Sequence, residues 1–339
     1  MPSEASLASE KETGSEASGE GASLWKRRAR FFRAVVVCHA AGTALFIAAL
    51  LLGEATRLSF ILLYLPRQPV LAVTVAAALL ALLMRNRALL ALEGVIALVV
   101  LFPVMGFVIS WPKHADHPIS LVSYNVFFGK LGREALLNEV ASTNADIILL
   151  QAANDSMAER LRERLPDRTT RQDGELVIST RFPIREASVP ERLPSDTEAM
   201  FVRYVLETPS GPLEVFNVHP FSPREALYDK GAVAQDVSRR EAQIAAAVRA
   251  ARSAGAPFVI AGDTNLPAMS AIARRQLGDL NDAFDDAGVG LGYTFPAKHP
   301  WMRLDRVLSG RGIRFVDVRV APLGASDHRR LFVEFEVVL

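Results

Sequence analysis

Pro257-Phe-Val-Ile-Ala-Gly-Asp-Thr-Asn265 joins a short apolar run to a polar end. Residues 258–261 are all apolar, which predicts a buried strand. Asp263 and Asn265 follow at its end, where a carboxylate and an amide are placed to hold a phosphate, a water molecule or a metal ion. Glycine, aspartate and asparagine also form ordinary turns, so this stretch alone leaves a turn and a site as equal alternatives.

Polar side chains lie at the ends of other predicted strands in the same way. They are Asn125 after residues 119–124, His219 after 213–218, Asp305 within 304–308, and Asp327 and His328 before 331–338. Carboxylate and amide oxygens are hard ligands that suit Mg²⁺ or Mn²⁺, and histidine is the usual proton-transfer group near neutral pH. A metal that polarises a phosphoryl oxygen, an aspartate that activates water and a histidine that stabilises the transition state together make a phosphoesterase.

Composition divides the chain into parts. It has 339 residues, a formal net charge of +1 and 50% hydrophobic residues, a length that allows two domains. Residues 1–30 begin with a Ser-, Glu-, Gly- and Ala-rich stretch and predict a disordered cytoplasmic tail. Residues 31–111 are mostly apolar, 112–118 form a polar linker, and 119–339 have the composition of a soluble domain. Cys38 is the single cysteine, which excludes a disulfide within the chain.

The apolar part predicts about three transmembrane helices. Residues 34–53 and 88–111 are long enough to span a bilayer, and 69–84 form a shorter run that an interfacial piece at 58–65 precedes. Seven Lys and Arg residues flank the N-terminus and the second loop, against two in the first loop, which places the N-terminus in the cytoplasm. We therefore expect an integral protein of the bacterial inner membrane whose C-terminal domain is periplasmic or extracellular. If the middle run does not span, the domain lies on the other side.

In the soluble part, strand patterns outnumber helix patterns and many are apolar on both faces, as in sheets covered by helices. The strands are expected at residues 119–124, 146–150, 176–179, 201–207, 213–218, 258–261, 304–308, 315–320 and 331–338, and the helices at 131–143, 156–165 and 224–252.

Six short motifs, taken in order, resemble the endonuclease/exonuclease/phosphatase superfamily, which includes deoxyribonuclease-like and sphingomyelinase-like phosphoesterases. They are Tyr124-Asn125, Asp146-Ile-Ile-Leu-Leu-Gln151, Asn217-Val-His219, Gly262-Asp-Thr-Asn265, Leu304-Asp305 and Ser326-Asp-His328. The resemblance covers residues 119–339. It implies an α/β fold, a four-layered α/β sandwich with two central sheets flanked by helices, here preceded by a three-helix transmembrane segment.

The resemblance also implies roles for the strand-end residues. Asp263 would orient or activate the attacking water or handle the leaving oxygen, and Asp305 would pair with His328, favouring its charged form. The implied catalytic residues are His219, Asp263, Asn265, Asp305 and His328. Contacts with the substrate phosphate are implied for Asn125, His219 and Asn265, and Mg²⁺ or Mn²⁺ would be bound through Asn125, position 152 and Asp327.

Position 152 departs from the family pattern. The family reads Leu-Gln-Glu after the second strand, and that glutamate is the principal metal ligand, whereas this chain reads Leu150-Gln151-Ala152. Alanine has no donor atom, so metal binding should be weakened. Asp155 and Glu159 lie nearby in the sequence. Either the natural chain lacks this ligand, as a pseudoenzyme or as an enzyme that binds its metal differently, or Ala152 is an introduced replacement.

Two functions therefore stay open. The first is a membrane-anchored, Mg²⁺- or Mn²⁺-dependent phosphoesterase, impaired at Ala152, and the second is a membrane-anchored binding or scaffold protein without catalysis. The substrate is expected to be a phosphodiester or phosphomonoester of a lipid, a small envelope metabolite or nucleic acid. Residues 112–339 carry two more Asp and Glu than Lys and Arg, which argues against a broad nucleic-acid footprint. Partners are thus the ester substrate and the lipid bilayer, and the sequence does not indicate an oligomeric state.

Overall fold

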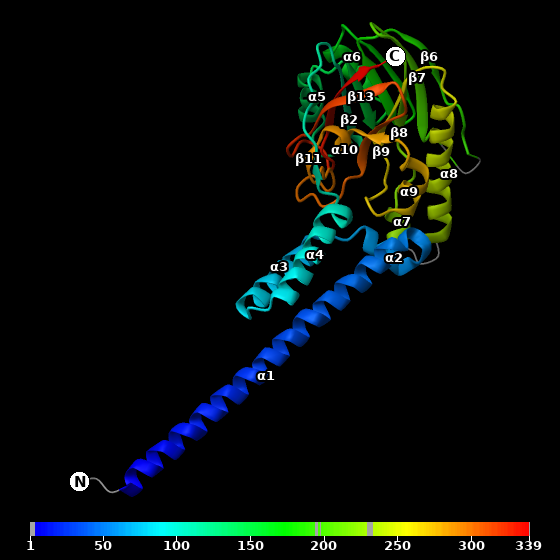
Figure 1. Ribbon diagram of the computed structural model, residues 1–339. Coiled ribbons are helices and arrows are strands. Elements are labelled where there is room, and N and C mark those ends of the chain that lie inside the picture. The colour runs from blue at the N-terminus through cyan, green and yellow to red at the C-terminus, as the bar shows by residue number, and fades with distance from the viewer. Residues whose placement is uncertain (1–3, 194–195, 197, 229–232, 339) are drawn as a thin grey trace. The chain divides into compact units, whose positions relative to one another are not determined.

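The computed structural model describes residues 4–193, 196, 198–228 and 233–338 (Figure 1). The chain forms two compact units. The first consists of Met1–Ala48 and Arg67–Leu101, and the second of Ala49–Pro66 and Phe102–Leu339. Residues 49–66, which composition assigns to the membrane region, therefore group with the C-terminal domain.

The first unit is helical. It contains most of α1 (Glu4–Leu51), together with α3 (Gln68–Leu83) and α4 (Arg87–Val99). The side chain of Asn86 caps α4 by accepting a hydrogen bond from the Leu89 N–H. By length and composition, Arg27–Leu51 and Arg87–Val104 can each cross a membrane, and a third span exists only if the broken pair of α2 (Arg57–Leu63) and α3 is counted as one.

Helix α1 runs through residues 4–30, where composition predicts a disordered tail. Alanine, glutamate and lysine in this stretch favour a helix, and no proline interrupts it after Glu4. The boundaries of the tail and of the transmembrane region stay predictions.

A buried polar cluster joins the three helices of the first unit. His39 on α1 lies 3.0 Å from Glu93 on α4, between His Nδ1 and a carboxylate oxygen. Its other nitrogen lies 3.2 Å from the Thr43 hydroxyl and 3.4 Å from that of Thr74 on α3. Because Glu93 and Thr74 are fully buried, these contacts fix the register of the helices, since buried polar groups need partners.

The second unit contains two six-stranded mixed sheets. The first has the order β13-β14-β2-β3-β5-β4, and β2 and β3 are its parallel pair. Its strands are β2 (Ile119–Asn125), β3 (Ile147–Gln151), β4 (Thr169–Asp173), β5 (Leu176–Thr180), β13 (Ile313–Val320) and β14 (Leu331–Val337).

The second sheet has the order β10-β12-β9-β8-β7-β6, and β8 and β9 are parallel. Its strands are β6 (Ile184–Ser188), β7 (Phe201–Thr208), β8 (Gly211–Val218), β9 (Phe258–Asp263), β10 (Asn281–Asp282) and β12 (Asp305–Ser309). A separate two-stranded sheet pairs β1 (Val108–Ile109) with β11 (Val289–Gly290).

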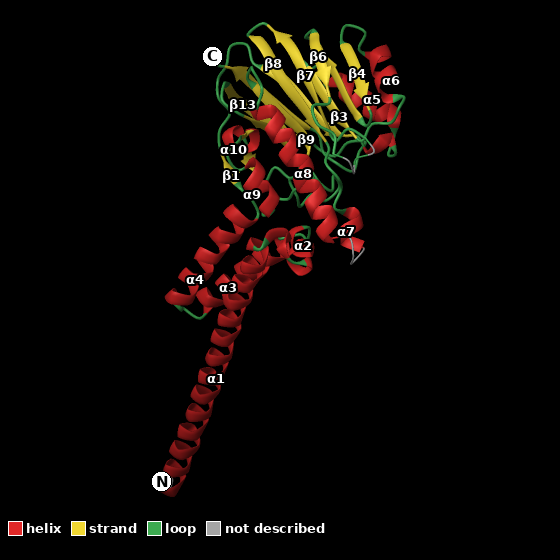
Figure 2. Cartoon of the chain, turned by 90° about the vertical axis from the view of Figure 1, so that its right-hand side faces the viewer, coloured by secondary structure: helices red, strands yellow, loops and turns green. Residues whose placement is uncertain are grey.

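Helices cover the outer faces of both sheets, and Figure 2 shows the resulting layers. Apolar residues of α5 (Arg133–Ser142) and α6 (Met157–Arg164) pack on β2, β3 and β5, and those of α8 (Val233–Arg252) and α9 (Ala271–Leu277) pack on β8 and β9. A third apolar cluster fills the space between the sheets. The expected α/β fold with two flanked sheets is confirmed. The remaining helical elements are η1 (Gly53–Ala55), η2 (Val100–Val104), η3 (Phe127–Gly129), α7 (Arg224–Tyr228) and α10 (Ala283–Ala287).

The strand order brings the polar strand ends to one edge. β2 ends at Asn125, β9 ends at Asp263, and β12 begins at Asp305, which pairs directly with Asp263. Gly262 makes the close approach of β8 and β9 feasible: its φ is +151°, and a Cβ there would lie 1.9 Å from the Val218 carbonyl oxygen. The expected helix 224–252 corresponds to α7 and α8, and residues 229–232 between them lie outside the described residues. The elements β4, β6 and α9 were not expected.

Candidate active site

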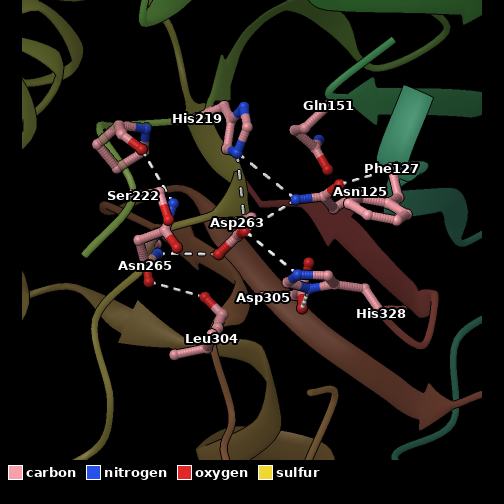
Figure 3. Close-up of polar contacts among 12 residues, drawn as sticks. Asn125, Phe127, Gln151, His219, Ser222, Asp263, Asn265, Leu304, Asp305 and His328 are labelled. Carbon is pink, nitrogen blue, oxygen red and sulfur yellow. Dashed lines mark hydrogen bonds and ion pairs between the residues drawn. The ribbon is translucent and has the colours of Figure 1, made fainter. Parts of the chain in front are cut away.

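Asp263 lies at the centre of the candidate site (Figure 3). It is 1% exposed. Its Oδ2 accepts a hydrogen bond from Asn125 Nδ2 at 2.9 Å and lies 3.8 Å from His219 Nε2 and 3.6 Å from His328 Nε2. One carboxylate oxygen therefore faces three nitrogen-bearing side chains from three different strands or strand ends.

His328 is held by Asp305. Its Nδ1 lies 2.8 Å from Asp305 Oδ2, and both side chains are buried. Burial by itself lowers the pKa of His328, but the carboxylates of Asp305 and Asp263 outweigh it and raise the pKa to about 9. The imidazole is therefore cationic at neutral pH, with Nδ1–H donated to Asp305 and Nε2–H directed toward Asp263.

The two asparagines are fixed by their own hydrogen bonds. Asn125 Oδ1 accepts from the Phe127 N–H at 3.1 Å, so its amide nitrogen points at Asp263. Asn265 has a left-handed backbone with φ +53°. Its N–H donates to Asp263 Oδ1 at 2.9 Å, and its Nδ2 donates to the Pro220 carbonyl at 2.9 Å. Both asparagines are thus arranged around Asp263.

His219 has a second carboxylate neighbour that sequence reasoning missed. Its Nδ1 lies 3.6 Å from Glu175 Oε2. Glu175 immediately precedes β5, whose Val177 pairs with Leu150 of β3, and its carbonyl accepts the Ala153 N–H at 3.0 Å. Glu175 therefore lies beside Ala152, on the strand next to the one that ends there. Only the strand pairing shows this, because Glu175 belongs to none of the motifs.

Ala152 is buried at the end of β3 with φ +49°. The structure thus places position 152 beside the site, as expected, without a metal-binding atom in its side chain. Asp155 and Glu159, the nearby carboxylates in the sequence, instead line a separate hollow with Arg162 and Gln172. None of the predicted site residues lines that hollow.

The residues of the site fit a divalent cation. Asp263, Asp305 and His328 bring possible ligand atoms within 4.8 Å of one another. Because His328 is cationic, the carboxylate oxygens of this group are the atoms open to a cation. Among the described residues, Asp305 Oδ1 and Gln151 Oε1 are buried acceptors without a hydrogen-bond partner. A bound cation could satisfy such oxygens. Burial raises the pKa of the nearby Asp327 carboxyl, with a smaller raising effect from Asp263. A cation would relieve that crowding of carboxylates.

A buried amide network lies under the site and was also missed. Gln151 Nε2 on β3 donates to Asn217 Oδ1 on β8 at 2.8 Å. Asn217 Nδ2 in turn lies 3.1 Å from both the Leu150 and the Val177 carbonyl oxygens. Because β3 and β8 belong to different sheets, this network fixes the two sheets against each other directly below Ala152 and His219.

The site thus combines a buried carboxylate, a cationic imidazole and two fixed amides. Such a set can orient a water molecule through Asp263 and stabilise negative charge through His328, Asn125 and Asn265. The structure brings together all five residues expected to be catalytic, together with Asn125 and position 152. Their individual roles stay predictions.

Comparisons with known proteins agree with this arrangement. Residues 122–328 match the model of the Endonuclease/Exonuclease/phosphatase family. A search of curated proteins finds no match.

Several solved structures have the same fold. The complex of D. rerio TDP2 with a single strand DNA product is 17% identical, with a TM-score of 0.52, and covers 66% of this chain and 100% of that one. An endonuclease/exonuclease/phosphatase family protein from Bacteroides thetaiotaomicron is 15% identical, with a TM-score of 0.51 and coverage of 67% and 100%. A mannosyl-6-phosphatase of the same species is 17% identical, with a TM-score of 0.50 and coverage of 64% and 99%.

Proposed function

The chain belongs to the endonuclease/exonuclease/phosphatase family, and from this membership we propose that it is a membrane-anchored, divalent-metal-dependent phosphoesterase. The observation that carries the proposal is the position of Asp263, buried and surrounded by Asn125, His219 and a cationic His328. A buried carboxylate with this many nitrogen-bearing neighbours suits the orientation of a water molecule beside a phosphate.

The proposed reaction is hydrolysis of a phosphate ester. The water oxygen attacks phosphorus, its proton passes to Asp263, and the bond from phosphorus to the ester oxygen breaks. The Nε2–H of His328, together with Asn125 and Asn265, stabilises the charge on the phosphoryl oxygens. When bound, Mg²⁺ or Mn²⁺ supplies Lewis-acid polarisation of a phosphoryl oxygen, and Asn125, Asp305 and Asp327 are the residues that would hold it, which leaves Asp263 to act as the base.

Glu175 is proposed to provide the carboxylate that Ala152 lacks. It lies beside position 152 through the pairing of β3 with β5, and its Oε2 reaches within 3.6 Å of His219 Nδ1. A negative charge at this edge of the site favours cation binding. With Glu175 in place, loss of the glutamate at 152 does not require loss of catalysis.

The proposed substrate is a phosphodiester or phosphomonoester of a lipid head group, a small envelope metabolite or nucleic acid. The solved structures with the same fold belong to proteins with different substrates. One TDP2 structure holds a DNA product, and another of these proteins is a mannosyl-6-phosphatase. Basic side chains that could follow a nucleic-acid backbone are engaged elsewhere. Arg160 and Arg164 pair with Glu134, and Arg330 pairs with Glu139 at 3.2 Å. Their pairing argues against a broad nucleic-acid footprint.

We further propose an inner-membrane location in a bacterium, with the N-terminus in the cytoplasm and the C-terminal domain outside it. Its support is the pair of long apolar helices and the asymmetry of Lys and Arg between the loops.

One test of the function uses the full chain in detergent. Hydrolysis of a chromogenic phosphodiester, a phosphomonoester, DNA and phospholipid is measured with and without Mg²⁺ or Mn²⁺. Metal-dependent turnover that Asp263→Asn or His328→Ala abolishes is the expected result, and the panel identifies the substrate class.

A catalytically silent scaffold is the second candidate, and Ala152 is the observation that favours it. The variant Ala152→Glu separates the two candidates. Turnover only after this substitution would show that the chain as written is a disabled enzyme. No turnover by either form, with ligand binding by both, would favour the scaffold.

A further inference from the structure

We infer that Tyr64, at the C-terminal end of α2, is a positioning residue of the phosphoesterase site, held on a segment outside the region that matches the family. The family match covers residues 122–328, whereas Tyr64 belongs to Ala49–Pro66, which folds as part of the second unit. This role rests on the proposed function, in which Asn265 holds the substrate phosphate.

The contact is direct and buried. Tyr64 donates its hydroxyl hydrogen to the Asn265 carbonyl oxygen at 3.1 Å. Tyr64 is 7% exposed and Asn265 is 5% exposed. A non-glycine residue in the left-handed region, as Asn265 is with φ +53°, needs its surroundings to hold it there. The N–H and side chain of Asn265 are held by Asp263 and Pro220, and Tyr64 holds its carbonyl.

Tyr64 is itself fixed from several sides. Trp301 Nε1 donates to the Tyr64 carbonyl at 3.1 Å, and a guanidinium nitrogen of Arg240 donates to the Tyr64 hydroxyl oxygen at 3.4 Å. Arg240 is fully buried, and its Nε donates to the Phe221 carbonyl at 2.9 Å. Phe60 stacks edge-on against the Tyr64 ring with 5.2 Å between centroids. The hydroxyl therefore has little freedom to leave Asn265.

The segment that carries Tyr64 is anchored on the domain at a second point. Glu54 is buried, and its carboxylate accepts the Ala271 N–H at 2.8 Å and the Ser270 hydroxyl. Gly53 approaches so closely that a Cβ at this position would lie 2.5 Å from the Ala271 Cβ. Residues 53–64 are thus built into the domain, and a movement of this segment would reach Asn265 through Tyr64.

Tyr64→Phe tests the inference because it removes only the hydroxyl. Tyr293→Phe is the matched control: Tyr293 is also buried, and its hydroxyl donates to the backbone carbonyl of Met105 at 2.9 Å, which is not a site residue. We expect Tyr64→Phe in the full chain to lower kcat/KM for a chromogenic phosphodiester about tenfold, because a displaced contact residue loses transition-state contacts. The control is expected to stay within about twofold of the unaltered chain, as for a hydrogen bond without a role at the site.

A double-mutant cycle separates positioning from general stability. If Tyr64 acts through Asn265, Tyr64→Phe causes no further loss of kcat/KM in the Asn265→Ala background. Losses that multiply would overturn the inference, because Tyr64 would then act independently of Asn265.

Amide hydrogen exchange supplies a readout that does not depend on activity. The Thr264 and Asn265 N–H groups are hydrogen-bonded to the Leu304 carbonyl and to Asp263, so peptides covering residues 263–266 should be protected. We expect faster exchange there in Tyr64→Phe and no change in Tyr293→Phe. If Tyr64→Phe is not recovered folded, Trp301→Phe removes the N–H that holds Tyr64 and should produce the same local change.

The two readouts also separate this inference from the proposed function. If the unaltered chain hydrolyses no ester but exchange at residues 263–266 rises as expected, the proposed function fails and the coupling of Tyr64 to Asn265 stands. If the chain is active and neither exchange nor kcat/KM changes in Tyr64→Phe, the inference is wrong.

Discussion

Ala152 offers no carboxylate at the end of β3, and we propose that Glu175, which immediately precedes the neighbouring strand β5, supplies one. The pairing of Leu150 with Val177 sets the two positions side by side, and Glu175 is partly exposed. Its side chain can therefore turn from His219 toward a cation without losing a buried contact.

We expect Glu175→Gln to weaken Mn²⁺ binding about tenfold or more, because the substitution removes a negative charge next to the cation. Isothermal titration calorimetry on the full chain measures the Mn²⁺ affinity. Adding Ala152→Glu to Glu175→Gln should restore the affinity. Glu159→Gln, in the separate hollow, is the matched control and should change nothing. Unchanged Mn²⁺ affinity in Glu175→Gln would show that Glu175 serves His219 alone.

Asp305 is expected to control the charge of His328. Burial lowers the pKa of His328, and the Asp305 and Asp263 carboxylates raise it to about 9, so removal of one carboxylate should lower it. In NMR titration of histidine-labelled, metal-free protein, Asp305→Asn should lower the His328 midpoint from about 9. The exposed His114 is the internal reference, and an unmoved His328 midpoint would contradict the assignment.

The raised pKa of His328 also makes the stability of the fold depend on pH. Because the folded pKa of His328 lies above the unfolded value of about 6.5, its contribution is complete below pH about 6.5. The contribution is lost as the pH rises through the folded value of about 9. Asp305→Asn should therefore cost stability at pH 6 and little at pH 10, as urea unfolding at the two pH values can show.

Motif order identified the residues around Asp263, because polar residues that end neighbouring strands meet at one sheet edge. It could not identify Glu175 or Tyr64. Glu175 reaches the site through the pairing of β3 with β5, and Tyr64 contacts a residue 201 positions away. Such contacts depend on strand register and tertiary packing, which hydrophobic periodicity does not encode.

Among the elements, β9 is tightly constrained. All six of its residues are buried, and it pairs with β8 in parallel and β12 in antiparallel fashion. Buried central strands of this kind are continuous apolar runs, so the sequence predicted them well. The edge strands β4 and β6 were missed because their patterns are mixed, whereas the edge strand β13 was expected. β6, for example, has largely exposed or half-buried positions, and its polar residues hide the alternation.

Gly262→Ala should disrupt β8 and β9 together. The added Cβ would lie 1.9 Å from the Val218 carbonyl oxygen, and φ is +151°, so the strands must separate. We expect a loss of about 3 kcal/mol or more in the free energy of unfolding. Gly255→Ala is the control, since a Cβ there meets nothing within 4 Å. Equal thermal unfolding midpoints for the two variants would contradict the close approach of β8 and β9.

For the whole chain, the family match accounts for residues 122–328 and leaves the N-terminal third to composition. Composition indicated three spans, but the residues described provide two long apolar helices and a third only through the broken pair α2 and α3. The expected middle span, residues 69–84, corresponds to α3, whose 16 residues are fewer than the roughly 20 that cross a bilayer. The apolar piece before it folds with the C-terminal domain, because Glu54 and Tyr64 hydrogen-bond to the buried residues Ser270 and Asn265.

Sidedness follows from the number of spans, and cysteine labelling can measure it. Cys38 is the single cysteine, so Cys38→Ser gives a cysteine-free chain in which new cysteines report alone. Leu323 in the C-terminal domain is 56% exposed, and Ala88 at the start of α4 is also exposed. Three spans place residue 323 outside the cytoplasm and residue 88 inside it. A membrane-impermeant maleimide should then label Leu323→Cys in intact bacterial cells whose outer membrane has been permeabilised. The same reagent should label Ala88→Cys only after the cells are lysed.

The reverse pattern would place the domain in the cytoplasm. Residues 58–84 would then not cross the bilayer as one span, because two spans return the chain to the side of its N-terminus. The seven basic residues around the N-terminus and the second loop favour the three-span arrangement, since Lys and Arg in short loops stay in the cytoplasm. Ala88→Cys changes none of these seven basic residues. The label therefore reports the topology that the natural distribution of Lys and Arg produces.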